Sequence, residues 1–183
     1  MMEEYLIECC SPTLASLKMG NIFNYPFPNV DDTDDQLAQW NQTLSEKGVR
    51  LTVLRRSKSS ALVYVYRPAV LQKRLKERDV RRFLKRYGYA KMGEREALTL
   101  LSQRLAGSEG FPHEIGVFLG YPLSDVKAFI RNGGKNSLYT GCWKVYSHKG
   151  EAMRTFERFK KCSRIYSELW AGGRSVQKLT VAV

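Results

Sequence analysis

The stretch from Arg50 to Tyr66, RLTVLRRSKSSALVYVY, decides the fold of this chain. Its two ends, residues 50–55 and 61–66, are rich in β-branched and aromatic residues, which favour strands. The polar residues 57–60 between them are typical of a hairpin turn. A shorter segment, Asn21–Tyr25, is a third candidate strand. The sequence therefore predicts an antiparallel hairpin with at least one further strand.

The segments around this hairpin have apolar residues at the spacing of amphipathic helices. Ser11 is a candidate N-cap with Pro12 at the first helical position, which predicts a short helix ending near Gly20. Together these patterns predict an α+β fold, a small mostly antiparallel sheet of three or four strands covered by six or more helices. We expect a single domain over residues 1–183, with a core over 5–173 and a C-terminal tail over 174–183. Further helices are expected over 31–47, 70–87 (two helices that meet near Arg78), 94–106 and 151–170.

Basic residues are concentrated in the middle of the chain, which has a net charge of +12. Residues 1–49 carry eight acidic and two basic side chains, whereas residues 50–104 carry sixteen basic and four acidic ones. Such asymmetry favours an anionic macromolecular partner, although a solvated helix surface that keeps the protein soluble explains it equally well. The candidate partner-binding residues are Arg74, Arg78, Arg81, Arg82, Lys85 and Arg86.

Localisation and cofactor content are constrained by what the sequence lacks. No apolar run approaches the roughly 18 residues that a membrane span needs, and the N-terminus does not resemble a secretory signal. The four cysteines form no C-x-x-C pair, so neither a disulfide framework nor a zinc site is predicted. We therefore expect a cytoplasmic protein without a metal or other cofactor.

The segment 113–131 resembles a helix-turn-helix, because two helical faces flank the turn residue Gly120. Ser124, Lys127 and Arg131 on the second helix are candidate contacts to nucleic acid. For reading bases this set is poor, because no Arg, Asn or Gln lies early in the helix. A buried helix corner explains the same pattern, and we favour it.

A cysteine-dependent enzyme is a further hypothesis. Cys10 would stand just before the helix predicted to begin at Pro12, where the helix dipole lowers the pKa of a thiol. His113 and Glu114 would supply a base and the group that orients it. No local signature joins these residues, and a single cysteine is more often a small buried apolar residue.

The chain contains the motifs 10–15 (CSPTLA), 21–23 (NIF), 62–67 (LVYVYR), 111–116 (FPHEIG), 118–123 (FLGYPL) and 143–146 (WKVY). With these motifs it resembles a bacterial domain-of-unknown-function family, number 3793, from about Cys10 to Gly173. The family has no assigned activity, so the resemblance implies no catalytic residues. It does imply occurrence beside flavodoxin-like and iron-uptake functions in anaerobic bacteria, and flavodoxins are acidic.

These observations give three functional hypotheses. The leading one is an accessory or binding protein whose basic face docks an anionic partner, an acidic protein such as a flavodoxin being favoured over nucleic acid. The second is a nucleic-acid-binding regulator that uses the segment 113–131. The third is the cysteine-dependent enzyme.

Overall fold

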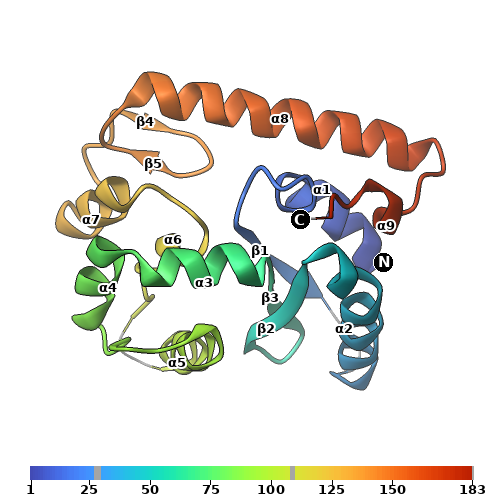
Figure 1. Ribbon diagram of the computed structural model, residues 1–183, viewed down its shortest axis with the longest axis horizontal. Coiled ribbons are helices and arrows are strands. Elements are labelled where there is room, and N and C mark those ends of the chain that lie inside the picture. The colour runs from blue at the N-terminus through green and yellow to red at the C-terminus, as the bar shows by residue number, and fades with distance from the viewer. Residues whose placement is uncertain (27–29, 108–109, 183) are drawn as a thin grey trace.

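A three-stranded antiparallel sheet lies at the centre of the molecule, in the strand order β1-β3-β2 (Figure 1). The computed structural model describes residues 1–26, 30–107 and 110–182. The predicted hairpin is confirmed as β2 (Arg50–Arg56) and β3 (Ser60–Tyr66), and β1 (Gly20–Pro26) pairs with the other edge of β3. Strand β3 is almost wholly buried because it lies between two strands and is covered on both faces.

Helices surround this sheet, and a two-stranded sheet of β4 (Tyr139–Thr140) and β5 (Lys144–Val145) lies beside them. The predicted α+β class is confirmed, as is the break between the two helices after β3. The helices are α1 (Met2–Leu14), α2 (Val30–Leu44), α3 (Pro68–Lys76), α4 (Arg78–Lys85), α5 (Glu94–Ala106), α6 (Ile115–Phe118), α7 (Leu123–Arg131), α8 (Lys149–Ala171) and α9 (Val176–Leu179), with a 3-10 turn, η1 (Ser45–Lys47).

The sheet separates two apolar cores. Alternate side chains of a strand point to opposite faces, so Tyr64 and Tyr66 pack with residues from α3 to α7. Val63 and Val65 pack instead with residues from α1, α2, α8 and α9. Each functional residue therefore belongs to one side of the sheet or the other.

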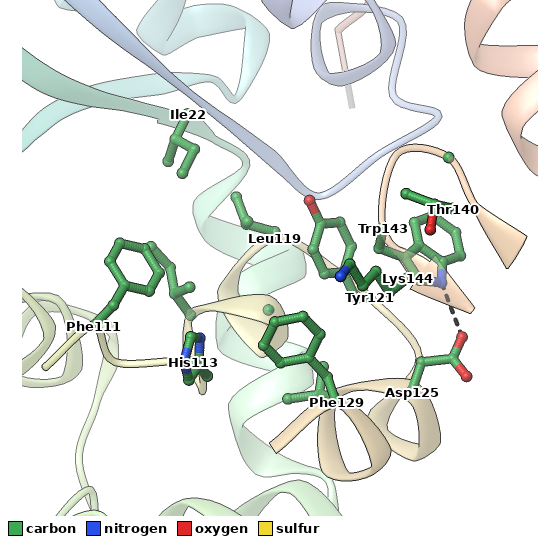
Figure 2. A pocket seen from close by; sticks show the side chains of 14 residues that line it. Ile22, Phe111, His113, Leu119, Tyr121, Asp125, Phe129, Thr140, Trp143 and Lys144 are labelled. Atoms are coloured by element: carbon green, nitrogen blue, oxygen red, sulfur yellow. Dashed lines mark hydrogen bonds between the residues drawn. The ribbon is translucent and has the colours of Figure 1, made fainter. Parts of the chain in front are cut away.

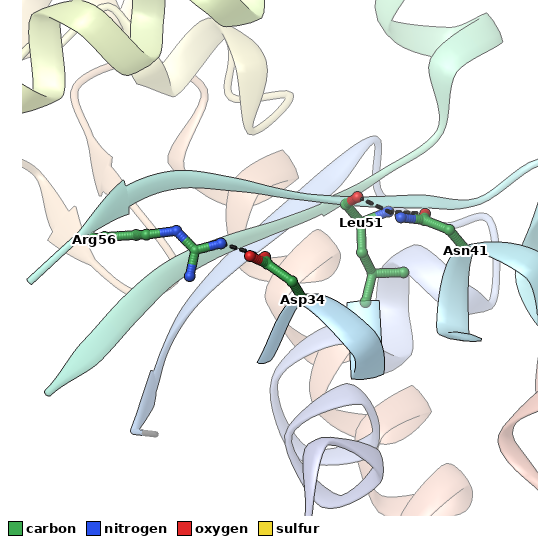
Figure 3. A network of polar contacts seen from close by, with 4 residues as sticks. All are labelled: Asp34, Asn41, Leu51 and Arg56. Atoms are coloured by element: carbon green, nitrogen blue, oxygen red, sulfur yellow. Dashed lines mark hydrogen bonds and ion pairs between the residues drawn. The ribbon is translucent and has the colours of Figure 1, made fainter. Parts of the chain in front are cut away.

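The outer edge of β2 is covered by α2 (Figure 3). The side-chain amide of Asn41 donates to the Leu51 carbonyl at 2.9 Å and accepts from the Leu51 N–H at 2.8 Å. Farther along, Arg56 of β2 pairs with Asp34 of α2. Asn41 thus replaces the missing strand at Leu51, which protects an edge that would otherwise be open to pairing.

The first helix differs from its prediction. It begins at Met2, and Ser11 and Pro12 lie in its last turn, not at its start. The buried residues Met2, Leu6 and Cys10 are spaced four apart, and this periodicity outweighs the Ser-Pro signal. Pro12 has no N–H to donate to the preceding turn, and the helix ends two residues later at Leu14.

The C-terminal segment also differs, because part of the expected tail belongs to the core. Val176 and Leu179 of α9 are buried with the residues of α1 and α8. The side chain of Arg67 is only 2% exposed, and its guanidinium joins the C-terminal segment to the end of α1 by hydrogen bonds. It donates to the carbonyls of Thr13 (2.9 Å), Leu14 (2.8 Å), Lys47 (3.1 Å) and Val181 (2.8 Å).

Candidate functional site

Four basic side chains form a stripe along the outer face of α4. Arg78, Arg81, Arg82 and Lys85 lie at positions i, i+3, i+4 and i+7, which share one face of a helix. All four are exposed, whereas the opposite face of α4 is buried in the core. We call these four residues the basic stripe. Figure 1 shows α4 at one end of the molecule, beside α3 and α7.

The basic stripe is poorly compensated within the described residues. Its recorded ion pair joins Arg82 to Asp79 at 3.7 Å, and both side chains are exposed, so the pair adds little. Arg78 and Arg81 lie in the first turn of the helix, where the macrodipole disfavours cations. Like charges three or four residues apart also destabilise a helix. Arg82 and Lys85 lie in the last turn, where the macrodipole favours cations, so only the first half of the stripe opposes the stability of α4.

The other two residues predicted to bind a partner lie differently. Arg86 is exposed directly after α4 and extends the stripe. Arg74 is turned toward the protein, because it donates to Glu77 at 2.6 Å and to the Tyr121 carbonyl at 3.2 Å. Arg74 thus ties α3 to the turn before α7 and is the least available of the six.

The helix-turn-helix segment is present only in part. Gly120 adopts the left-handed φ of +77° that the turn requires, and α7 follows it. The first helix, α6, is a single turn. Ser124 lies 3.1 Å from the Ser147 hydroxyl, and the Lys127 ammonium lies 5.9 Å from the centroid of the Phe83 ring of α4. Lys127 therefore lies beside a ring from the buried face of α4, and Arg131 is exposed at the end of α7.

Cys10 and His113 lie on opposite sides of the sheet. Cys10 is fully buried in the core formed by α1 and α8. His113 is exposed and borders a cavity with Ile22 and Leu119 on the other side. Because Cys10 is in the last half of α1, the helix start that would activate it is absent, and burial raises the pKa of its thiol well above the usual value. The structure does not bring the predicted pair together.

We expect Cys10 to react slowly with iodoacetamide in the folded protein. Its thiol is buried and its raised pKa keeps it protonated, whereas Cys142 is exposed in the turn between β4 and β5. Peptide mapping by mass spectrometry should find Cys142 modified first, and Cys10 only after denaturation. Rapid native modification of Cys10 that His113→Ala abolishes would restore the cysteine hypothesis.

Glu114 is buried and hydrogen-bonded, whereas its neighbour His113 is exposed. Glu114 is 1% exposed, and its carboxylate accepts from Arg104 at 2.6 Å and from the Tyr89 hydroxyl at 3.1 Å. This group joins α5 to the turn before α6. Burial, together with the Glu114 charge, raises the pKa of Tyr89. His113 has no recorded hydrogen bond with Glu114, so Glu114 is not placed to orient its imidazole.

A cavity of about 300 Å³ opens beside His113 (Figure 2). Its walls come from α6, α7 and the β4–β5 hairpin, which follow one another in sequence, and from β1, which is distant. Desolvation by burial is the main cause that raises the pKa of Tyr121 in this wall to about 12, with a smaller contribution from Cys142. The main side chains around the cavity are Ile22, Phe111, His113, Leu119, Tyr121, Phe129, Trp143 and Lys144.

Asp125 holds the hairpin wall of this cavity in place. Its buried carboxylate accepts from the Trp143 indole N–H at 2.9 Å and from the backbone N–H groups of Tyr146 (2.9 Å) and Ser147 (3.1 Å). The Ser147 hydroxyl adds a fourth contact at 3.1 Å. Four donors on one buried carboxylate fix α7 against β5 and fix the plane of Trp143.

The described part of the chain has neither a metal-binding cluster nor a membrane-spanning helix. No group of three or more His, Cys, Asp or Glu side chains is arranged there to hold a metal ion. Among those same residues, no helix is both long and apolar enough to cross a membrane.

These features define an α+β protein with an exposed basic helix on one side of its sheet and an aromatic cavity near it. The chain belongs to the family described as "Protein of unknown function (DUF3793)", whose family model matches residues 6–180, nearly the whole chain. This confirms the resemblance seen in the sequence. No curated protein and no solved structure gives a match.

Proposed function

We propose that the protein is a cytoplasmic accessory protein that docks an acidic protein, such as a flavodoxin, on its basic stripe. The observation that supports this proposal is the stripe itself, four exposed cations on one face of an eight-residue helix. Their mutual repulsion destabilises the free protein, and a partner with carboxylates opposite the stripe would relieve it.

The shape of the surroundings favours an acidic protein over nucleic acid. A recognition helix must project into the major groove, but α7 is packed against β5 through Asp125 and lies beside α4. Of its candidate contacts, Ser124 is already paired with Ser147. Few side chains of α7 are therefore available to contact bases. Carboxylates on a convex protein surface, by contrast, can reach the stripe directly.

Binding of a labelled flavodoxin, followed by fluorescence anisotropy at low ionic strength, tests this proposal. Reversal of three stripe charges (Arg81→Glu, Arg82→Glu and Lys85→Glu together) should weaken binding at least about tenfold, since each exposed pair contributes roughly 0.5 kcal/mol or more. The matched control reverses Arg158, Lys160 and Lys161, which are exposed on α8, and should bind nearly as well as the native protein.

Polyglutamate serves as a second probe, so that the choice of flavodoxin does not decide the result. The proposal fails if neither probe binds the native protein, or if the stripe variant and the α8 variant weaken binding equally. Circular dichroism spectra of both variants should match that of the native protein, because all six side chains are exposed.

A further inference from the structure

The cavity beside His113 lies apart from the basic stripe, and aromatic rings form much of its walls. Phe129 forms one wall, with the His113 ring 5.0 Å and the Lys144 ammonium 5.9 Å from its centroid. Trp143 forms the other, packed on Tyr121 at 5.2 Å with the two planes 31° apart. Figure 2 shows these rings around the opening. Such surfaces favour a flat, aromatic molecule.

Lys144 and Asp125 give the cavity one charge of each sign, and the ammonium of Lys144 has donors left for a ligand. Lys144 is half-buried and its recorded hydrogen bond is to the Gly134 carbonyl at 2.7 Å, while an ammonium group has three donors. Asp125 also lines the cavity, but its carboxylate already accepts from four donors of the hairpin. An anionic group that enters would therefore meet an available cation.

A glycine lets the lining of the cavity pack closely against α6. Gly116 lines the floor, where a Cβ atom would lie only 2.8 Å from the Val126 side chain and 3.1 Å from the Tyr121 ring. The absence of a side chain at Gly116 lets Val126 and Tyr121 approach the helix α6. The adjoining turn then carries Tyr121 to the cavity wall.

We propose that this cavity binds a small planar aromatic carboxylate, with its ring between Phe129 and Trp143 and its carboxylate on Lys144. A volume of about 300 Å³ is at the lower end of small-molecule sites, which suits one or two fused rings. The proposal is independent of the docking of an acidic protein, since the stripe residues do not line the cavity.

Titration with naphthoate, followed by the indole N–H signals in two-dimensional NMR, tests the proposal. The Trp143 signal, assigned with Trp143→Phe, should shift on binding, whereas those of Trp40 and Trp170 should not. Naphthamide has the same rings without the charge, and cyclohexanecarboxylate has the charge without the aromatic ring. Both should bind at least about tenfold more weakly than naphthoate, because each loses one of the two matched features.

Three variants give independent controls. Lys144→Met should weaken naphthoate binding about tenfold or more and leave naphthamide unchanged. Lys135→Met removes an exposed lysine from the neighbouring turn and should have no effect. Thr140→Phe places a ring at the mouth of the cavity from an exposed position and should block binding while Lys144 remains.

The proposal is overturned if naphthoate leaves the Trp143 signal of the native protein unchanged, or if naphthamide binds as tightly as naphthoate. It is also overturned if a peptide ending in phenylalanine binds while naphthoate does not, because the site would then recognise a chain terminus of a protein.

Discussion

Replacing Arg67 by methionine should lower the free energy of unfolding by at least about 3 kcal/mol. The guanidinium donates to four carbonyls from the end of α1, from η1 and from the C-terminal segment. A hydrogen bond from a charged group contributes about 1.5–3 kcal/mol, and although the Thr13 and Leu14 carbonyls keep the N–H groups of Ser16 and Val181, four such bonds are lost together. Since small domains are stable by about 5–15 kcal/mol, this one change removes a large share of the total.

Urea unfolding followed by circular dichroism measures this effect. Arg55→Met is the matched control, because Arg55 is an exposed arginine of the sheet and should change stability by less than about 0.5 kcal/mol. Arg67→Lys should fall between the two, since lysine keeps the charge but lacks the planar fork that reaches several carbonyls. Equal unfolding midpoints for Arg67→Met and the control would contradict this role.

Replacing Asp125 by alanine should destabilise the protein by about 3 kcal/mol and detach the β4–β5 hairpin from α7. The substitution leaves two backbone N–H groups and the Trp143 indole N–H without their acceptor, and each unpaired buried donor costs about 1–3 kcal/mol. The effect should be strongest in the hairpin, because the sheet β1-β3-β2 does not contact this carboxylate.

Hydrogen exchange distinguishes this local effect from a general loss of stability. The amides of Tyr146 and Ser147 should exchange much faster in Asp125→Ala, whereas those of Val63 and Val65 should change only with global stability. Asp79→Ala, at an exposed aspartate of α4, should leave all four unchanged. Normal protection of Tyr146 in Asp125→Ala would show that the hairpin is held by other contacts.

Much of the fold could be predicted because its signals are local. The hairpin over residues 50–66, the two helices after it and the helix over 94–106 follow from residue periodicity within one segment. The predicted start of the first helix was wrong. The Ser11-Pro12 pair is a common helix start, but the apolar spacing from Met2 is the stronger signal. A capping pattern in the sequence does not show which residues the tertiary structure buries, and burial decides where this helix begins.

The candidate sites were harder to predict, for the same reason. The basic stripe could be recognised from the spacing of its four cations within α4. The cavity could not, because Ile22 is more than a hundred residues from Phe129 and Lys144 and meets them only in the folded chain. Glu114 was taken for a functional residue because its partner Arg104 belongs to another helix.

Competition between two anionic probes tests the central claim, that the basic stripe selects an acidic protein, most directly. A labelled flavodoxin is bound to the native protein at fixed salt and then displaced by unlabelled flavodoxin or by duplex DNA of equal total charge. We expect the flavodoxin to displace the label at a concentration at least about tenfold lower than the duplex, and the triple stripe variant to bind the label at least about tenfold more weakly than the native protein. Displacement by the duplex at the lower concentration would contradict it and favour a nucleic-acid-binding regulator.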